Sequence, residues 1–236
     1  LLIVIKTDNR FLTLFNRVIN MFTDNTAERY IKELVTRYPA LESAAESLDR
    51  VYSTIKNSFF NDKILFCAGN GGSAADCEHI AGELMKGFLL RRPLSAELAK
   101  EMTDKTGDSQ LAGKLQMGLR CISLISHPAL NTAYMNDVDP NMIYAQQLFA
   151  LGRSGDVMIG ISTSGGAANI CNAFKVARAK GIVTVLFTGL KHGICEEFAD
   201  LILRAPESET FKVQEYHLPL YHCLCMMLED AFYGKR

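Results

Sequence analysis

The feature that most constrains the fold is a stretch in which an apolar run ends in a glycine-rich turn and continues as a helix. Apolar residues 64–66 lead into Gly69-Asn70-Gly71-Gly72-Ser73, and a helix is expected from there through Leu84. Glycine permits backbone conformations closed to other residues, which indicates a strand, a tight turn and a helix start. Such a junction directs backbone N–H groups and the positive end of the helix dipole at one point. The stretch therefore predicts a site for a phosphate or another anion.

Five short apolar segments, separated by helix-like ones, predict the sheet. They are rich in Val, Ile, Leu and Phe without polar alternation, which is typical of parallel strands buried on both faces. The segments are residues 63–68, 120–125, 156–162, 182–188 and 200–204. The expected fold class is α/β, a doubly wound three-layer αβα sandwich with a five-stranded parallel sheet. Ligands in such sheets bind outside the carboxyl ends of the strands.

The length of 236 residues fits one well-filled α/β domain. We expect residues 23–236 to form this domain and residues 1–22 to be an uncertain N-terminal extension. Two amphipathic helices with a break near Pro39 are expected before the first strand, either as subunit contacts or as a cover for one face of the sheet. A helical insertion is expected at about residues 94–119. Arg91-Arg92, just before it, is interpreted as a solvated basic pair, with a phosphate contact as the alternative.

Composition limits the partners. The formal net charge of -1 gives no broad attraction for nucleic acid or an anionic membrane. No apolar run approaches the roughly 20 residues that a membrane helix needs. The seven cysteines are scattered, odd in number and free of any Cys-x-x-Cys pattern, which indicates reduced, buried thiols of a cytoplasmic protein. Small-molecule chemistry is therefore the expectation.

A second turn repeats the pattern of a strand, a tight turn and a helix start. Ser162-Thr163-Ser164 follows the third apolar segment and precedes a helix expected at residues 167–179. One capping hydroxyl is enough at a helix start, so three in succession favour a phosphate site over simple capping. Residues 135–140 are interpreted as a turn, in which the acids Asp137 and Asp139 cap the following helix, bind ligand hydroxyls, or do both.

Two helices carry the candidate chemistry. His79 and Glu83 stand four residues apart and project from one face of the first helix. A final helix is expected over about residues 211–231, interrupted at Pro219. We assign four of its side chains to one face: Gln214, His217, Tyr221 and His222. Imidazole, carboxylate and amide groups together can bind a divalent metal such as zinc. A Glu and a His can instead transfer protons, and either residue taken singly is also compatible with a structural role.

These motifs occur in a recognisable order. Along the chain they are Gly69-Asn70-Gly71-Gly72-Ser73, His79-Ile80-Ala81-x-Glu83-Leu84, Gly160-Ile161-Ser162-Thr163-Ser164-Gly165, and Gln214-Glu215-x-His217 with His222. Together they closely resemble the phosphoheptose isomerase branch of the sugar isomerase (SIS) domain superfamily, over about residues 25–236. The resemblance implies a flavodoxin-like domain and a homotetramer with active sites at subunit interfaces. It also implies interconversion of sedoheptulose 7-phosphate and D-glycero-D-manno-heptose 7-phosphate.

The same resemblance assigns roles to residues. Glu83 and His222 match the catalytic acid/base pair, without an indication of which one abstracts the carbon-bound proton. The implied zinc ligands are His79, Glu83, Gln214 and His222. The implied substrate contacts are Asn70, Gly71, Gly72, Ser73, Asp137, Ser162, Thr163, Ser164 and Gln214.

Three positions depart from the family pattern. Ala167 stands where the phosphate loop usually has another serine, Lys86-Gly87-Phe88 where a Gly-Arg-aromatic triplet is common, and Phe211 where an acidic residue is usual. Two other functions are therefore kept: a non-catalytic SIS module, acting as a phosphosugar-sensing regulator or a replication-initiator adaptor, and an isomerase of another phosphosugar. Such adaptors typically lack the equivalents of Glu83 and His222, so the presence of both residues in this chain favours an enzyme.

Overall fold

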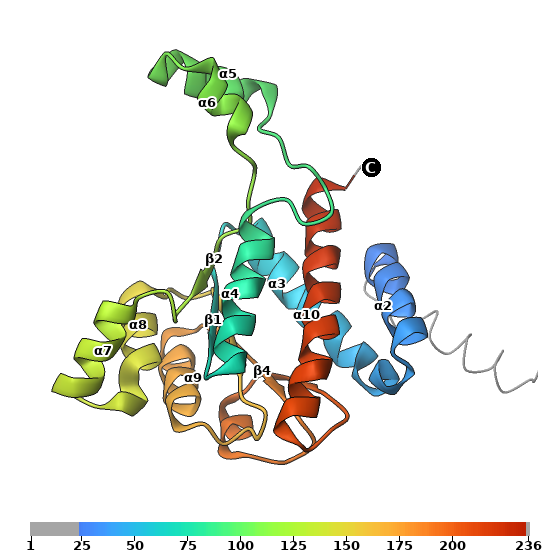
Figure 1. The fold of residues 1–236 in the computed structure, drawn as a ribbon, viewed down its shortest axis with the longest axis vertical. Coiled ribbons are helices and arrows are strands. Elements are labelled where there is room, and N and C mark those ends of the chain that lie inside the picture. Colours follow the sequence, from blue (N-terminus) through green and yellow to red (C-terminus); the bar gives the residue numbers. More distant parts are fainter. Residues whose placement is uncertain (1–23, 235–236) are drawn as a thin grey trace, which may run out of the picture.

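Residues 24–234 are described by a computed structural model, and the extension expected at residues 1–22 lies outside them. Helices and strands alternate along most of the chain (Figure 1). In order the elements are α2 (Asn25–Arg37), the 3₁₀ helix η1 (Pro39–Ala44), α3 (Ala45–Phe60), β1 (Leu65–Gly69), α4 (Gly72–Met85), α5 (Ala96–Thr106), α6 (Ser109–Lys114), β2 (Cys121–Ser123), α7 (Pro128–Asp137), η2 (Pro140–Met142), α8 (Ile143–Leu151), β3 (Val157–Ile161), α9 (Ala168–Lys180), β4 (Val183–Thr188), η3 (Ile194–Phe198), β5 (Leu201–Arg204) and α10 (Thr210–Tyr233).

The five strands form one parallel sheet in the order β2-β1-β3-β4-β5, which confirms the expected fold class. This is the flavodoxin-like order, and it reverses direction between β1 and β3. Side chains alternate between two buried cores. Leu65 and Cys67 face the core formed with α2, α3, α4 and α10, whereas Phe66 and Ala68 face the core formed with α8 and α9. Burial on both faces explains why the strands show no polar alternation.

The two N-terminal helices cover one face of the sheet. Asp24 caps α2, since its Oδ1 accepts the N–H of Ala27 at 2.9 Å. The expected break lies at Tyr38-Pro39, where η1 begins. Ile31 of α2 and Leu48 of α3 are buried in the core that these helices share with α10. Of the two roles expected for them, covering the sheet is the one that these contacts show.

The segment expected to be a helical insertion contains α5 and α6, which we call the arm. Figure 1 shows the arm extending away from the rest of the domain. Ala112 is the only buried residue in these two helices. Pro93 and Gln116 form an antiparallel bridge at the base, so the chain leaves and re-enters the domain at one place.

Deleting the arm tests whether the stability of the domain depends on it. Replacing residues 95–114 by a short glycine-serine linker should change the melting temperature by only about 2–4 °C, because the arm buries almost no apolar surface and a shorter loop costs slightly less entropy to close. Circular dichroism melting of the two chains measures the difference. A fall of about 10 °C or more would show that the arm stabilises the domain.

Three expectations are corrected here. Met135, Asn136 and Asp137 are the last residues of α7, so the expected turn is confined to Val138 and Asp139. The Asp139 Oδ1 caps the following helix, η2, by accepting the N–H of Asn141 at 2.7 Å. Helix α10 continues through Pro219 without a break. Arg92 is buried and paired with Glu229, so it is neither solvated nor free to bind a phosphate, whereas Arg91 is exposed.

The cysteines agree with the expectation of buried thiols. All seven cysteines are buried and unpaired. Within residues 24–234, no helix has the length and apolar character needed to cross a membrane.

Candidate active site

The two turns identified in the sequence lie side by side at the carboxyl edge of the sheet. They are adjacent because β1 pairs directly with β3, at the point where the strand order reverses. Asn70 of the first turn and Asn169 at the start of α9 exchange amide hydrogen bonds of 3.0 and 2.8 Å. Gly71 has φ +56°, a conformation that favours glycine. The turns therefore form one continuous polar edge.

The hydroxyl groups of the second turn are only partly free. The Ser162 Oγ accepts the N–H of Ala167 at 3.3 Å, and the Ser164 Oγ accepts the N–H of Gly166 at 3.3 Å. Each oxygen can still donate its hydrogen to a ligand. Stabilising the turn and binding an anion are thus compatible here, although the sequence analysis treated them as alternatives.

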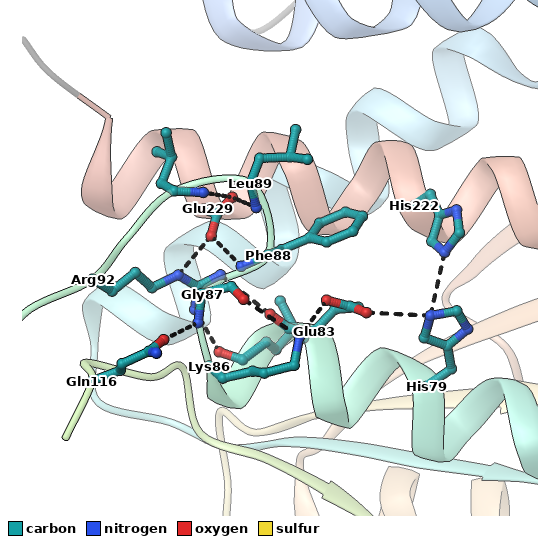
Figure 2. Close-up of polar contacts among 12 residues, drawn as sticks. His79, Glu83, Lys86, Gly87, Phe88, Leu89, Arg92, Gln116, His222 and Glu229 are labelled. Carbon is teal, nitrogen blue, oxygen red and sulfur yellow. Dashed lines mark hydrogen bonds and ion pairs between the residues drawn. The ribbon is translucent and has the colours of Figure 1, made fainter. Parts of the chain in front are cut away.

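His79, Glu83 and His222 come together between α4 and α10 (Figure 2). The His79 Nε2 lies 3.3 Å from the Glu83 Oε1 and 3.5 Å from the His222 Nε2. His79 and Glu83 face the same way because they are four residues apart on α4. The structure therefore places Glu83 and His222, the expected acid/base pair, on either side of the His79 imidazole.

A relay behind His79 fixes its tautomer. The Tyr221 O–H donates to the Asp76 Oδ1 at 3.2 Å, so the Tyr221 oxygen accepts from the His79 Nδ1–H at 2.9 Å. The Nε2 lone pair of His79 then points towards Glu83 and His222. Sequence analysis missed Asp76, which lies seven residues before Glu83 on the same helix and could have been found by that spacing.

Removing the Tyr221 hydroxyl should weaken the site. Tyr221→Phe is expected to lower turnover by about 10-fold, the lower end of the range for groups that orient a ligand or a catalytic imidazole. Steady-state kinetics measure this, with Tyr216→Phe on the same helix as the control. Equal effects of the two changes would contradict a role for the relay.

Burial favours the neutral form of His222. Desolvation lowers the pKa of His222, and the neighbouring His79 and Arg37 lower it further, while Glu83 acts in the opposite direction. A neutral imidazole carries a lone pair that can accept a proton or bind a metal.

Lys86 also contacts the pair, although the sequence analysis gave it no role. Its Nζ lies 2.9 Å from the Glu83 Oε2, while the other carboxylate oxygen faces His79 (Figure 2). Lys86 belongs to the Lys86-Gly87-Phe88 triplet, which the sequence analysis noted only as a departure from the expected pattern. Its ammonium group therefore holds one oxygen of the Glu83 carboxylate.

The structure places the remaining expected site residues at several other positions. Gln214 lies over the first turn, since a Cβ added at Gly72 would be 2.7 Å from its Nε2. Ser73 is buried. Asp137 is exposed at the end of α7, on the α8 and α9 side of the sheet, and its carboxylate accepts from Asn136 at 2.9 Å. The described contacts do not join Asp137 to Glu83 or His222.

His217 does not share a face with His222, which corrects the sequence analysis. Five residues of an α-helix turn through about 140°, so the two side chains diverge. His217 is buried, with its Nε2 3.3 Å from the Thr188 carbonyl oxygen. Desolvation lowers its pKa to about 4, which keeps it neutral.

The imidazole pair fits a zinc ion in donor type and spacing. Zinc–nitrogen bonds of about 2.0–2.1 Å at tetrahedral angles separate two nitrogens by about 3.4 Å, and the two Nε2 atoms lie 3.5 Å apart. No group of three His, Cys, Asp or Glu side chains in the described part of the chain forms a complete metal site. The imidazoles match zinc, and the full ligand set remains an expectation.

Comparison with known proteins agrees with this geometry. Two family models, both described as SIS domain, match residues 29–116 and 131–228. The fold and the paired turns therefore define an SIS-domain protein. A phosphoheptose isomerase of Burkholderia pseudomallei (strain 1710b) is 34% identical over 94% of this chain and 99% of its own. One from Maridesulfovibrio salexigens is 38% identical over 72% of this chain and 71% of its own.

Solved structures show the same likeness. Phosphoheptose isomerase GmhA from Neisseria gonorrhoeae superposes with a TM-score of 0.64 at 25% identity, covering 94% of this chain and 98% of that one. A phosphoheptose isomerase from Francisella tularensis shares the fold, with a TM-score of 0.69 at 20% identity over 94% and 97% of the chains. The chain belongs to the phosphoheptose isomerase family, whose members are isomerase enzymes.

Proposed function

We propose that this chain interconverts sedoheptulose 7-phosphate and D-glycero-D-manno-heptose 7-phosphate. The observation that carries the proposal is the meeting of Glu83, His79 and His222 between α4 and α10, next to the paired turns. Relatives over nearly the full length of the chain are named phosphoheptose isomerase, which supports this activity.

The proposed mechanism is proton transfer through an enediol. A proton leaves the carbon next to the sugar carbonyl and returns to the neighbouring carbon, while a hydroxyl proton moves the other way. Glu83 and His222 share these roles, because one group must act as base while the other protonates the developing enediolate oxygen. Lys86 holds one oxygen of Glu83 and leaves the other beside His79.

The polar edge is the proposed binding surface for the substrate. Backbone N–H groups at the start of α9 and the hydroxyls of Ser162, Thr163 and Ser164 suit a phosphate. Asn70, the glycines at 71 and 72, Ser73 and Gln214 form the neighbouring part of the site. Holding the phosphate would fix the position of the reacting carbons relative to Glu83 and His222.

We also propose one zinc ion per site, held by His79, Glu83, Gln214 and His222. A nitrogen bound to zinc has no lone pair for a proton, so the His222 Nε2 would transfer protons only when it is not bound to the ion. Bound zinc supplies Lewis-acid polarisation of a carbonyl oxygen. The imidazole spacing and the Tyr221–Asp76 relay behind His79 support this, since such outer groups orient metal-binding histidines. Elemental analysis of the purified protein, before and after dialysis against a chelator, measures the metal.

A homotetramer in the cytoplasm completes the proposal. Exposure of His79, Asn70 and Gly71 leaves the site open on one side, which a second subunit could cover. Exposed apolar side chains such as Phe149 and Phe211 offer contact area. Seven unpaired thiols suit a reducing compartment. Light scattering measures the mass in solution.

A substrate panel tests the function. Ketose phosphates of five, six and seven carbons are assayed for aldose formation, and the reaction is repeated in D₂O. We expect the highest kcat/KM with sedoheptulose 7-phosphate, and solvent deuterium bound to carbon in the product. Preference for a shorter sugar would reassign the substrate. No turnover with any of them, together with tight binding of a protein partner, would favour a non-catalytic adaptor.

A further inference from the structure

A fully buried ion pair ties together the two helices that carry the proposed acid/base pair. The Arg92 Nε lies 2.8 Å from the Glu229 Oε1, with side-chain exposures of 0% and 2%. The guanidinium also lies over the ring of Tyr233, 4.8 Å from its centre. Arg92 belongs to the loop that follows α4, and Glu229 belongs to α10 (Figure 2).

Glu229 also fixes the backbone of this loop. Its Oε1 accepts the N–H of Phe88 at 2.8 Å, and its Oε2 accepts those of Leu89 and Leu90 at 2.8 and 3.1 Å. Three successive N–H groups thus converge on one carboxylate. We call Arg92, Glu229 and the backbone of residues 88–90 the clasp.

Arg92 connects the clasp to the last turn of α4. Its Nη1 donates to the Leu84 carbonyl oxygen at 2.7 Å, and its Nη2 donates to that of Glu83 at 3.2 Å. Carbonyl groups at the end of a helix have no partner within the helix, so they are free to accept these bonds. The guanidinium therefore holds the backbone of Glu83 itself.

The clasp also reaches His222. Glu229 follows His222 by seven residues, two helical turns, so both lie on one side of α10. The ring of Phe88, whose N–H is held by Glu229, lies 5.6 Å from the His222 ring. Both members of the acid/base pair are thus adjacent to groups that the clasp orders.

We propose that Arg92 and Glu229 are positioning residues, which set the placement of Glu83 and Phe88 relative to His222. A buried ion pair is by itself weak evidence for added stability, because an apolar pair of similar volume often stabilises a fold as well or better. Its location between the two helices that carry the acid/base pair therefore points to positioning. This inference rests on the proposed isomerase function, because positioning matters only if Glu83 and His222 transfer protons.

Glu229→Gln tests the proposal, with Asp156→Asn as the matched control. Both changes convert a buried carboxylate that accepts backbone N–H groups into an amide. Asp156 accepts from Ile64 at 2.9 Å and from Arg153 at 2.7 Å, next to the start of β3 and therefore at the opposite edge of the sheet from the site. A general loss of stability affects both variants, whereas a positioning effect is confined to Glu229→Gln.

Kinetics are measured well below the melting temperature of each variant. We expect kcat of Glu229→Gln to fall about 10- to 100-fold, because small displacements of reacting groups have effects of this size. KM should stay within about threefold, and Asp156→Asn should keep nearly full turnover. Equal kcat values for the two variants would overturn the proposal.

A second variant, Arg92→Lys, tests the proposal if Glu229→Gln does not fold. Arg92→Lys keeps the positive charge but cannot reach Glu229 and both carbonyl groups at once, so the same fall in kcat is expected. If neither variant folds while Asp156→Asn does, the pair is required for folding and the proposal is overturned.

Hydrogen exchange tests the role of the clasp independently of the proposed isomerase function. If the wild-type protein shows no turnover with any substrate, the proposed function has failed, and exchange then decides on the clasp. In Glu229→Gln we expect faster exchange at residues 79–86 as well as at 88–92. Faster exchange confined to residues 88–92 would show that the clasp orders its own loop and does not position Glu83.

Discussion

Glu83→Gln should lower kcat by ~10²-fold or more, with KM changing much less. The amide keeps the shape of the side chain but can neither accept a proton from carbon nor keep the ion pair with Lys86. Steady-state assays of the wild type and the variant, at matched zinc content, measure the effect.

Glu78→Gln is the control for this change. Glu78 is exposed on the same helix, α4, so the control removes the same charge without touching His79 or His222. Circular dichroism checks that both variants fold. Turnover of Glu83→Gln within about threefold of the control would contradict its assignment to proton transfer.

His222→Asn should have an effect of similar size, a fall in kcat of ~10²-fold or more. The change removes the imidazole Nε2 that lies 3.5 Å from the His79 Nε2. Asparagine is shorter and its amide nitrogen has no available lone pair, so it cannot replace the base. The same assays apply, and loss of bound zinc in this variant would further support the proposed ligand set.

The control for His222 is His192→Asn. His192 is exposed and pairs with Glu196 at 3.0 Å, beyond the end of β4. Near-normal turnover in both His222→Asn and Glu83→Gln would remove the acid/base assignment altogether. Near-normal turnover in His222→Asn alone would leave Glu83 as the one essential group.

The sheet and the two turns could be predicted from sequence because their causes are local. Strands buried on both faces need continuous apolar runs, and β1 to β5 each overlap a predicted segment. The tight turns need residues such as Gly71, whose φ is +56°. The pairing of β1 with β3, which brings both turns to one edge, follows from the fold class and not from any single motif.

The error at Arg92 arose because its contact depends on a distant part of the chain. Arg92 appeared to be a surface residue because its partner, Glu229, lies 137 residues away. The acidic Glu229 directly follows the apolar Met226, Met227 and Leu228 and is itself buried, a pattern that signals a paired buried charge. His217 was misplaced by grouping residues five apart on one helical face, an error that the helical period itself could have prevented.

Helix α10 has a further consequence for how substrate preference can change. It covers the glycine turn with Gln214, supplies His222 and supports the loop after α4 through Glu229. Any rotation or shift of this helix alters all three contacts at once, so its sequence has little freedom to adapt to another sugar. Changes in substrate range are therefore expected to arise in the exposed turn residues, such as Asn70 and Ser164, which belong to other elements.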